Sequence, residues 1–314
     1  MSAAAMTLCA PIALAQQPPW PTRPVHIVVP FASGGGIDII TRLVAQKLTW
    51  PQGAVVENRP GGGSVLGSSM VARAAPDGYT LLMAGPPFTT NAALIAKLPY
   101  DSLKDFAPIM LTTYAPLVVV VHPSLSAKTI PELVTLAKAK LGQLFYASSG
   151  NGGPSHLAGE LFKSMAGVGI THVPYKGSAP AAVGLVAGDV QVGFGDLLSS
   201  IPFIKSGQMR PIALTSAKRS NVFPDLPTVA ESGMSGFEIL TWSGLMAPAD
   251  TPPVVIATLS TDFARALRMP EIRDKLATEG TTVVGDDQAT FAAFLRREID
   301  KVAQLAKIVS INID

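Results

Sequence analysis

Short apolar runs alternate with amphipathic segments along most of this chain, and this alternation limits the fold more than any other feature. The run VHIVVPF at residues 25–31 precedes a segment in which Ile37, Ile40, Val44 and Leu48 recur at helical spacing. The run AVVEN, a helical segment at residues 64–74 and the run YTLLMAG follow. Because strands that alternate with helices form largely parallel sheets, the sequence predicts an α/β fold.

A second series of the same kind begins at PLVVVVHP, residues 116–123. Thr129–Glu132, TIPE, is a capping box that predicts a helix start, and strands alternate with helices up to MRPIALTS at residues 209–216. The segment FEILTWSGLMAP then crosses back, and helical segments end the chain. We therefore expect two α/β domains, residues 18–120 with 246–314 and an inserted domain of residues 121–245, with a cleft between them.

The first 17 residues, MSAAAMTLCAPIALAQQ, are small and apolar, and ALA at residues 13–15 fits the A-x-A cleavage pattern of an export signal. A positive n-region is lacking, so we expect the natural start to lie upstream or to have been trimmed. Cys9, the only cysteine, lies in this segment. We predict a signal peptide cleaved near Ala15 and a periplasmic protein without disulfides or a catalytic thiolate. A disordered tail and a lipid attached at Cys9 are the alternatives.

Charge and motifs argue against several classes of protein. The net charge is +2 and no block of basic residues occurs, so we expect no nucleic acid partner. Gly34 and Gly36 begin a G-x-G-x-x-G pattern, but Ile39 takes the place of the third glycine. There is no G-K-[ST] tripeptide and no G-x-S-x-G. No two histidines have a metal-ligand spacing, so we expect neither a metal nor a cofactor.

Some titratable residues still allow an enzyme. The histidines are His26, His122, His156 and His172. The first two lie beside apolar strands and indicate structural roles, whereas the last two flank polar loops and either face a cleft or are structural. Asp38 and Asp196 follow strands, as catalytic carboxylates often do. Asp38 also falls in a first helical turn, where a carboxylate is favoured by the helix dipole and can hold the preceding glycines.

Small, polar or glycine-rich loops follow five predicted strands: FASGGG, AGPPFTTN, YASSGNGGPSH, PYKGSAP and FGDLLSS. In open α/β sheets, ligands bind outside the carboxyl ends of the strands. These loops offer backbone N–H groups, hydroxyls and helix N-termini, and Lys176 is their only lysine or arginine. Such a donor set suits a carboxylate or similar small anion. The alternative is that these loops are only turns.

Long segments of the chain resemble the extracytoplasmic solute receptors of tripartite tricarboxylate transporters, also called Bug-type receptors. They include WPTRPVHIVVPFASGGGIDIITRLVAQKL, VVENRPGGGSVLGSSMVARAAPDGYTLLMAG, YASSGNGGPSHLAGELFKSMAG, HVPYKGSAPA and RPIALTSAKRSNVFPDLPTVAESG. The resemblance implies a type II periplasmic-binding-protein fold, in which two mainly parallel α/β domains close on a ligand like a flytrap. It implies a di- or tricarboxylate, an acidic amino acid or an aromatic acid as ligand, and a permease of one large and one small subunit as partner. We expect a monomer.

The resemblance also implies which residues bind the ligand. The glycine loop at residues 31–38 would hold a carboxylate, largely through main-chain groups and ordered water, and the other loops would contact its far side. The matching residues are Phe31, Ala32, Ser33, Gly34, Gly35, Gly36, Asp38, Pro86, Thr89, Thr90, Ser148, Ser149, Asn151, Ser155, His156, Tyr175, Lys176, Gly177, Asp196 and Trp242. None is assigned a catalytic role. We expect Gly35→Val to abolish ligand-induced stabilisation and leave the fold intact.

The functional prediction is therefore a non-catalytic receptor that captures a small carboxylate and delivers it to a membrane permease. Two alternatives remain. The protein could be a ligand-sensing subunit that docks on a membrane signalling protein, or an α/β enzyme that uses Asp38, His156 and Asp196.

Overall fold

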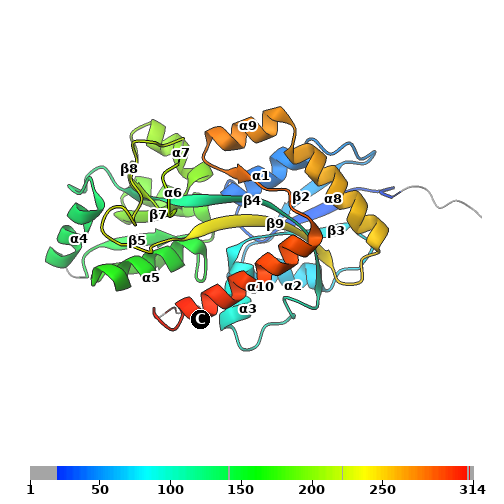
Figure 1. Cartoon of the computed structure of the whole chain (residues 1–314), viewed down its shortest axis with the longest axis horizontal. Coiled ribbons are helices and arrows are strands. Elements are labelled where there is room, and N and C mark those ends of the chain that lie inside the picture. The colour runs from blue at the N-terminus through cyan, green and yellow to red at the C-terminus, as the bar shows by residue number, and fades with distance from the viewer. Residues whose placement is uncertain (1–19, 141, 221, 310, 312–314) are drawn as a thin grey trace, which may run out of the picture.

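The computed structural model describes residues 20–140, 142–220, 222–309 and 311. The predicted signal peptide lies outside the described residues. Two lobes lie side by side, and two long strands, β4 (Phe106–Val121) and β9 (Leu240–Pro248), run from one lobe into the other (Figure 1). These strands pair antiparallel over most of their length, with Phe106 opposite Pro248 and Pro116 opposite Leu240. The chain therefore crosses between the lobes as strands of a sheet.

The first lobe is built on a parallel sheet with the strand order β2-β1-β3, which β9 continues. Its elements are β1 (Val25–Val29), α1 (Gly36–Ala45), β2 (Ala54–Asn58), α2 (Val65–Ala72), β3 (Thr80–Ala84), α3 (Pro86–Leu94), α8 (Pro253–Leu267), α9 (Pro270–Thr278), β10 (Thr282–Val283) and α10 (Gln288–Leu305). Ile27 packs with Val44 of α1 and Phe263 of α8, whereas its neighbour Val28 packs with Phe291 of α10 on the other face. Both faces of β1 are thus covered, which explains its continuous apolar run.

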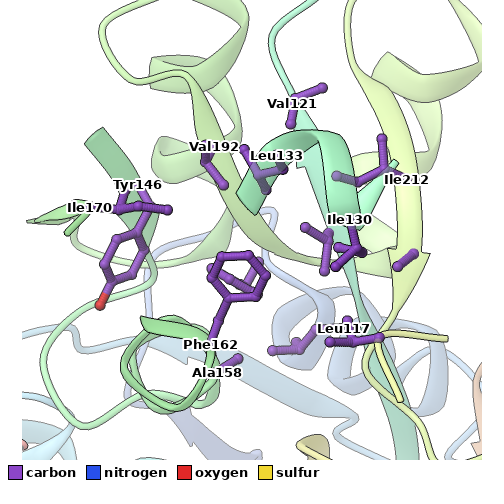
Figure 2. Close-up of a cluster of buried hydrophobic side chains, with 14 of the residues drawn as sticks. Leu117, Val121, Ile130, Leu133, Tyr146, Ala158, Phe162, Ile170, Val192 and Ile212 are labelled. Carbon is purple, nitrogen blue, oxygen red and sulfur yellow. The ribbon is translucent and has the colours of Figure 1, made fainter. Parts of the chain in front are cut away.

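The second lobe repeats this plan. Its elements are α4 (Ile130–Ala139), β5 (Phe145–Ser148), α5 (Pro154–Ala166), β6 (Thr171–Pro174), α6 (Ser178–Ala187), β7 (Val192–Asp196), α7 (Leu197–Lys205) and β8 (Arg210–Leu214). Val119 of β4 packs into a cluster with Phe162 of α5, and Figure 2 shows Phe162 within this cluster. Val120 packs instead with Leu185 of α6. The apolar run at residues 117–121 is therefore buried on both faces of the sheet.

The predicted α/β class and the type II binding-protein architecture are confirmed, and the sheet differs from a purely parallel one in its centre. Strands β6, β5 and β7 are parallel, as are β2, β1 and β3, but β4 pairs antiparallel with β7, β8, β9 and β10. The predicted domain boundaries fall inside β4 and β9 and stay a prediction. No described helix has the length and apolar character to cross a membrane.

Two segments that sequence patterns indicated as loops are helices. Pro86–Leu94 forms α3, and Leu197–Lys205 forms α7. Pro86 and Pro87 suggest a loop, yet proline is tolerated in a first helical turn because its missing N–H has no helical partner there. At α7, the side chain of Asp196 accepts a hydrogen bond from the Ser199 N–H and caps the helix.

Candidate ligand-binding site

Four helices begin around a cavity between the lobes: α1 and α3 from the first lobe, α5 and α6 from the second. Their first turns line this cavity through Gly36, Pro86, Pro154 and Ser178. The residue before each helix is a glycine, and none of these four N-termini has a side-chain cap. By contrast, α4, α7 and α10 are capped by a threonine or aspartate side chain. The four glycine-capped N-termini therefore direct helix dipoles toward one place, which suits an anion. Backbone N–H donors at these starts come from α1, α5 and α6, because Pro86 and Pro87 leave the first two positions of α3 without an N–H.

This interlobe cavity has a volume of about 30 Å³. None of the described residues lining it is a lysine, arginine or histidine, so the positive end of the site is made of backbone dipoles. A volume of this size holds about one water molecule. A ligand with several carbon atoms is larger than this volume, so the lobes that hold it stand further apart than in this arrangement.

Asp38 holds the glycine loop that precedes α1. Its carboxylate is almost fully buried and accepts hydrogen bonds from the Gly34 N–H at 2.9 Å, from Asn58 Nδ2 at 2.9 Å and from Arg42 Nε at 3.0 Å. Asn58 Nδ2 also donates to the Phe31 carbonyl, at the start of the same loop. Burial alone would raise the pKa of Asp38, but these hydrogen bonds outweigh it and the pKa is lowered. Asp38 thus braces the loop, as its place in the first turn indicated.

The two lobes touch at the glycine loop. A Cβ atom at Gly36 would lie 2.5 Å from both carboxylate oxygens of Asp196, which comes from the second lobe. A Cβ at Gly177, whose φ is +129°, would lie 3.2 Å from Ala32 Cβ, and a Cβ at Gly63 would lie 3.2 Å from the Asn151 carbonyl oxygen. The lobes are thus in contact here, and a side chain at Gly36 fits only if the Asp196 carboxylate moves aside.

Gly35→Val stays a prediction, and the structure shows only that the first carbon of a side chain fits at Gly35. A Cβ at Gly35 meets its nearest atoms, the Ala32 carbonyl oxygen and Ser178 Cβ, at 3.7 and 3.8 Å, which is ordinary van der Waals contact. The approach that leaves no room for a side chain is one residue further on, at Gly36. Sequence alone could not distinguish the three adjacent glycines, because the difference is set by the opposite lobe.

A polar cluster underlies the loop at residues 148–153 of the second lobe. Ser148 Oγ lies 2.5 Å from His172 Nε2, and Ser155 Oγ accepts from the Ser149 N–H at 2.8 Å. The Gly152 N–H donates to His156 Nδ1 at 3.1 Å. The rings of His156 and His172 stack with centroids 4.1 Å apart. Burial lowers the pKa of both histidines, and the neighbouring His156 helps to lower that of His172, to about 4. Both rings are therefore neutral at pH 7 and support the loop.

The predicted site residues do not all reach the interlobe cavity. Those that line it are Phe31, Gly35, Gly36, Asp38, Pro86, Ser149 and Asp196. The hydroxyls of Thr89 and Thr90 both donate to the Pro86 carbonyl, within α3. Trp242 packs edge-on against Phe291 and Phe294 of α10 and lines a smaller neighbouring cavity.

The remaining predicted residues lie around the loops. Ala32, Ser33 and Gly34 belong to the glycine loop, and Lys176 is exposed at the turn before α6. The Tyr175 ring packs closely on Gly184 of α6. Ser155 lines a cavity within the second lobe, and Asn151 places its carbonyl against Gly63. Which of these residues contacts a ligand stays a prediction.

Sequence reasoning missed several cavity-lining residues: Ile37, Pro87, Pro154, Ser178 and Thr241. Four of them lie in the first turn of a helix that follows a glycine N-cap. That position was an available signal for α1, α5 and α6, because Gly35, Gly153 and Gly177 precede predicted helices, but not for α3, which was expected to be a loop. Thr241 had no such signal. In the described part of the chain, no group of three or more His, Cys, Asp or Glu residues is arranged to hold a metal ion.

Comparison with known proteins places the chain in a family. Residues 40–311 match the family model described as tripartite tricarboxylate transporter family receptor. Protein BugT of Bordetella pertussis is 34% identical, over 92% of this chain and 90% of BugT. The structure of R. palustris Rpa4515 with adipate is 36% identical, with a TM-score of 0.90 over 93% of this chain and 99% of that one. MatC from Rhodopseudomonas palustris with bound malate is 31% identical, with a TM-score of 0.87 over 91% and 99% of the two chains. The resemblance found in the sequence is thus confirmed, and the chain belongs to the tripartite tricarboxylate transporter receptor family of solute-binding proteins.

Proposed function

We propose that this protein is a periplasmic receptor that captures a small carboxylated molecule between its lobes and delivers it to a tripartite tricarboxylate-type membrane permease. The observation that carries the proposal is the convergence of four glycine-capped helix N-termini on one cavity, without a cationic side chain among its described lining residues. Backbone donors of this kind bind a carboxylate without a fixed counter-charge. The carboxylates in two structural neighbours, adipate and malate, support the same ligand class.

The lobes should close on the ligand because the four helices come from both lobes. Because α1 and α3 belong to one lobe and α5 and α6 to the other, a carboxylate among their N-termini contacts both lobes only when they close. A ligand shifts a conformational equilibrium by its differential affinity for the two states. Ligand binding therefore favours lobes that have closed on the ligand, slightly further apart than the lobes described here, and the permease would receive the ligand from this state.

A thermal-shift and calorimetry screen tests ligand capture. The panel contains mono-, di- and tricarboxylates, aromatic acids, and the methyl esters or amides of the same acids as matched neutral controls. We expect one or more free acids to raise the melting temperature while the matched neutral derivatives do not. A panel in which no acid binds but a neutral sugar or an amine does would overturn the proposal.

Two further measurements separate delivery from sensing and from catalysis. Cells that lack the receptor should take up the bound acid more slowly; unchanged uptake with a lost transcriptional response would indicate a sensor. The ligand recovered from a stoichiometric complex should be chemically unchanged. Recovery of a converted product would indicate an enzyme.

A further inference from the structure

Asp196 lies where three cavities meet. It is the only described residue that lines the 30 Å³ interlobe cavity, a 20 Å³ cavity within the second lobe and a 10 Å³ cavity beside Trp242. Its carboxylate faces the α carbon of Gly36, at the N-terminus of α1. A carboxylated ligand that enters this space therefore comes close to a second carboxylate, supplied by the protein.

No described residue neutralises the charge of Asp196. The carboxylate accepts a hydrogen bond from the Ser199 N–H at 3.2 Å, and Asp196 takes part in no ion pair within the described chain. The other carboxylate of the interlobe cavity, that of Asp38, is held by Gly34, Arg42 and Asn58. The two acidic groups thus differ: Asp38 pairs with a cation, whereas the charge of Asp196 is favoured only by hydrogen bonds at the N-terminus of α7.

The groups that surround Asp196 offer no other proton or cation. From the first lobe, α1 contributes the ionisable residues Asp38 and Arg42, which bind one another, and the neighbouring strand and loop contribute the neutral Thr241 and Thr281. From the second lobe come the neutral Ser149, Ser178 and Ser200. A ligand carboxylate in this space would meet a like charge that no cationic side chain offsets, and burying two such charges together is unfavourable unless one is neutralised.

We propose that Asp196 and a ligand carboxylate share one proton, so that ligand binding takes up a proton from the solvent. The O–H of Asp196 donates to a carboxylate oxygen of the ligand, while the helix N-termini stabilise the remaining negative charge. This inference rests on the proposed function, since it requires a carboxylated ligand. Burial raises the pKa of Asp196 even without a ligand, against the opposing effect of the Ser199 hydrogen bonds, and an approaching anion raises it further.

The linkage has a definite sign. Proton uptake means that the affinity falls as the pH rises above the pKa of Asp196 in the ligand-free protein, by up to about 10-fold per pH unit. A ligand that carries an ammonium group opposite Asp196 would pair with the ionised carboxylate instead. Its binding would take up no proton.

Calorimetry in buffers of different ionisation enthalpy measures how many protons are taken up for each ligand bound. The probes are adipate, malate and the tightest-binding acid of the carboxylate screen, each titrated at several values between pH 5.5 and 8. In the wild-type protein we expect an uptake that reaches at least about half a proton per ligand bound. The affinity should fall across the same pH range.

Asp196→Asn is the matched variant. The asparagine side chain keeps an oxygen that can cap α7 and offers an N–H donor to the ligand, so the fold and a measurable affinity should remain. Proton uptake should fall to zero, and the affinity should become nearly independent of pH. The exposed Asp189 in the same lobe provides the control, because Asp189→Asn should behave as wild type.

The outcomes distinguish a failure of the shared proton from a failure of the proposed function. Acids that bind the wild-type protein without proton uptake at any pH, or an Asp196→Asn variant that retains the uptake, would overturn the shared proton and leave the receptor function standing. If no carboxylate produces heat in any buffer or shifts the melting temperature, the proposed function itself fails, and this inference fails with it.

Discussion

Asp38, whose carboxylate holds the glycine loop through hydrogen bonds, gives the most quantitative prediction. Asp38→Ala removes the acceptor of three hydrogen bonds from a side chain that is 3% exposed. The Gly34 N–H and the Asn58 amide lose a charged acceptor, and such hydrogen bonds contribute about 1.5 kcal/mol or more each. Arg42 is half-exposed and adds little, because water solvates its freed guanidinium. We expect a loss of about 3 kcal/mol in the free energy of unfolding.

For a protein of this size, such a loss corresponds to a melting temperature lower by about 5 °C. Calorimetric or circular-dichroism melting of the ligand-free protein measures it. Asp77→Ala is the matched control, because Asp77 also accepts from an arginine, at 2.8 Å, and from a backbone N–H, at 3.1 Å, but its side chain is 41% exposed. That variant should lose about 1 kcal/mol or less. Equal losses in the two variants would refute the bracing role of Asp38.

The pH dependence adds a second check on the same variant. The pKa of Asp38 is lower in the folded protein than its usual value of 3.8. Its contribution is therefore fully present above about pH 4, and is lost as the pH falls through the folded pKa. The gap in stability between wild type and Asp38→Ala should stay constant from pH 8 to about 5 and shrink below pH 4. A gap that widens on acidification would contradict the assignment.

Three further predictions test other parts of the site. Gly36→Ala should weaken ligand binding about 5- to 150-fold, because its methyl group meets Asp196 when the lobes close. Gly35→Ala should bind as wild type, and calorimetry measures both affinities. Equal affinities of the two variants would mean that the lobes do not close at Gly36. The folded pKa of His172 lies below its usual value, so the folded protein favours the neutral ring and loses stability as the pH falls from 6.5 to about 4. His172→Gln should make this loss smaller. Denaturant unfolding across this pH range measures it, and an unchanged pH profile would contradict the prediction. Trp242→Phe should lower the free energy of unfolding by less than about 1.5 kcal/mol and leave the ligand affinity within about threefold of wild type, because the ring packs against Phe291 and Phe294. A large loss of affinity would indicate that Trp242 contacts the ligand.

The sequence was informative where local rules decide the structure. The apolar runs at residues 25–29 and 117–121 are strands covered on both faces, as their unbroken hydrophobicity indicates. The bracing role of Asp38 was also accessible, because a carboxylate in a first helical turn beside glycines has few other local partners.

What the sequence did not reveal depends on contacts between distant segments. The helix α3 was hidden because two prolines and two threonines lower helical propensity, while packing of Phe88 against Tyr100 and Phe106 stabilises it. The requirement for glycine at Gly36, and not at Gly35, is set by Asp196, which is 160 positions further along the chain. The stacking of His156 on His172 joins two elements in the same way.

The central claim is that backbone N–H groups at the glycine-capped helix starts hold a ligand carboxylate. Amide NMR of the deuterated, ¹⁵N-labelled protein, titrated with the tightest-binding acid of the screen, tests it most directly. We predict that the amide signals of Gly35, Gly36 and Ile37 in the first lobe, and of Ser155 and Ser178 in the second, show the largest shifts. The methyl ester of the same acid should not produce them. Large shifts confined to other surfaces, or equal shifts with the ester, would contradict the account.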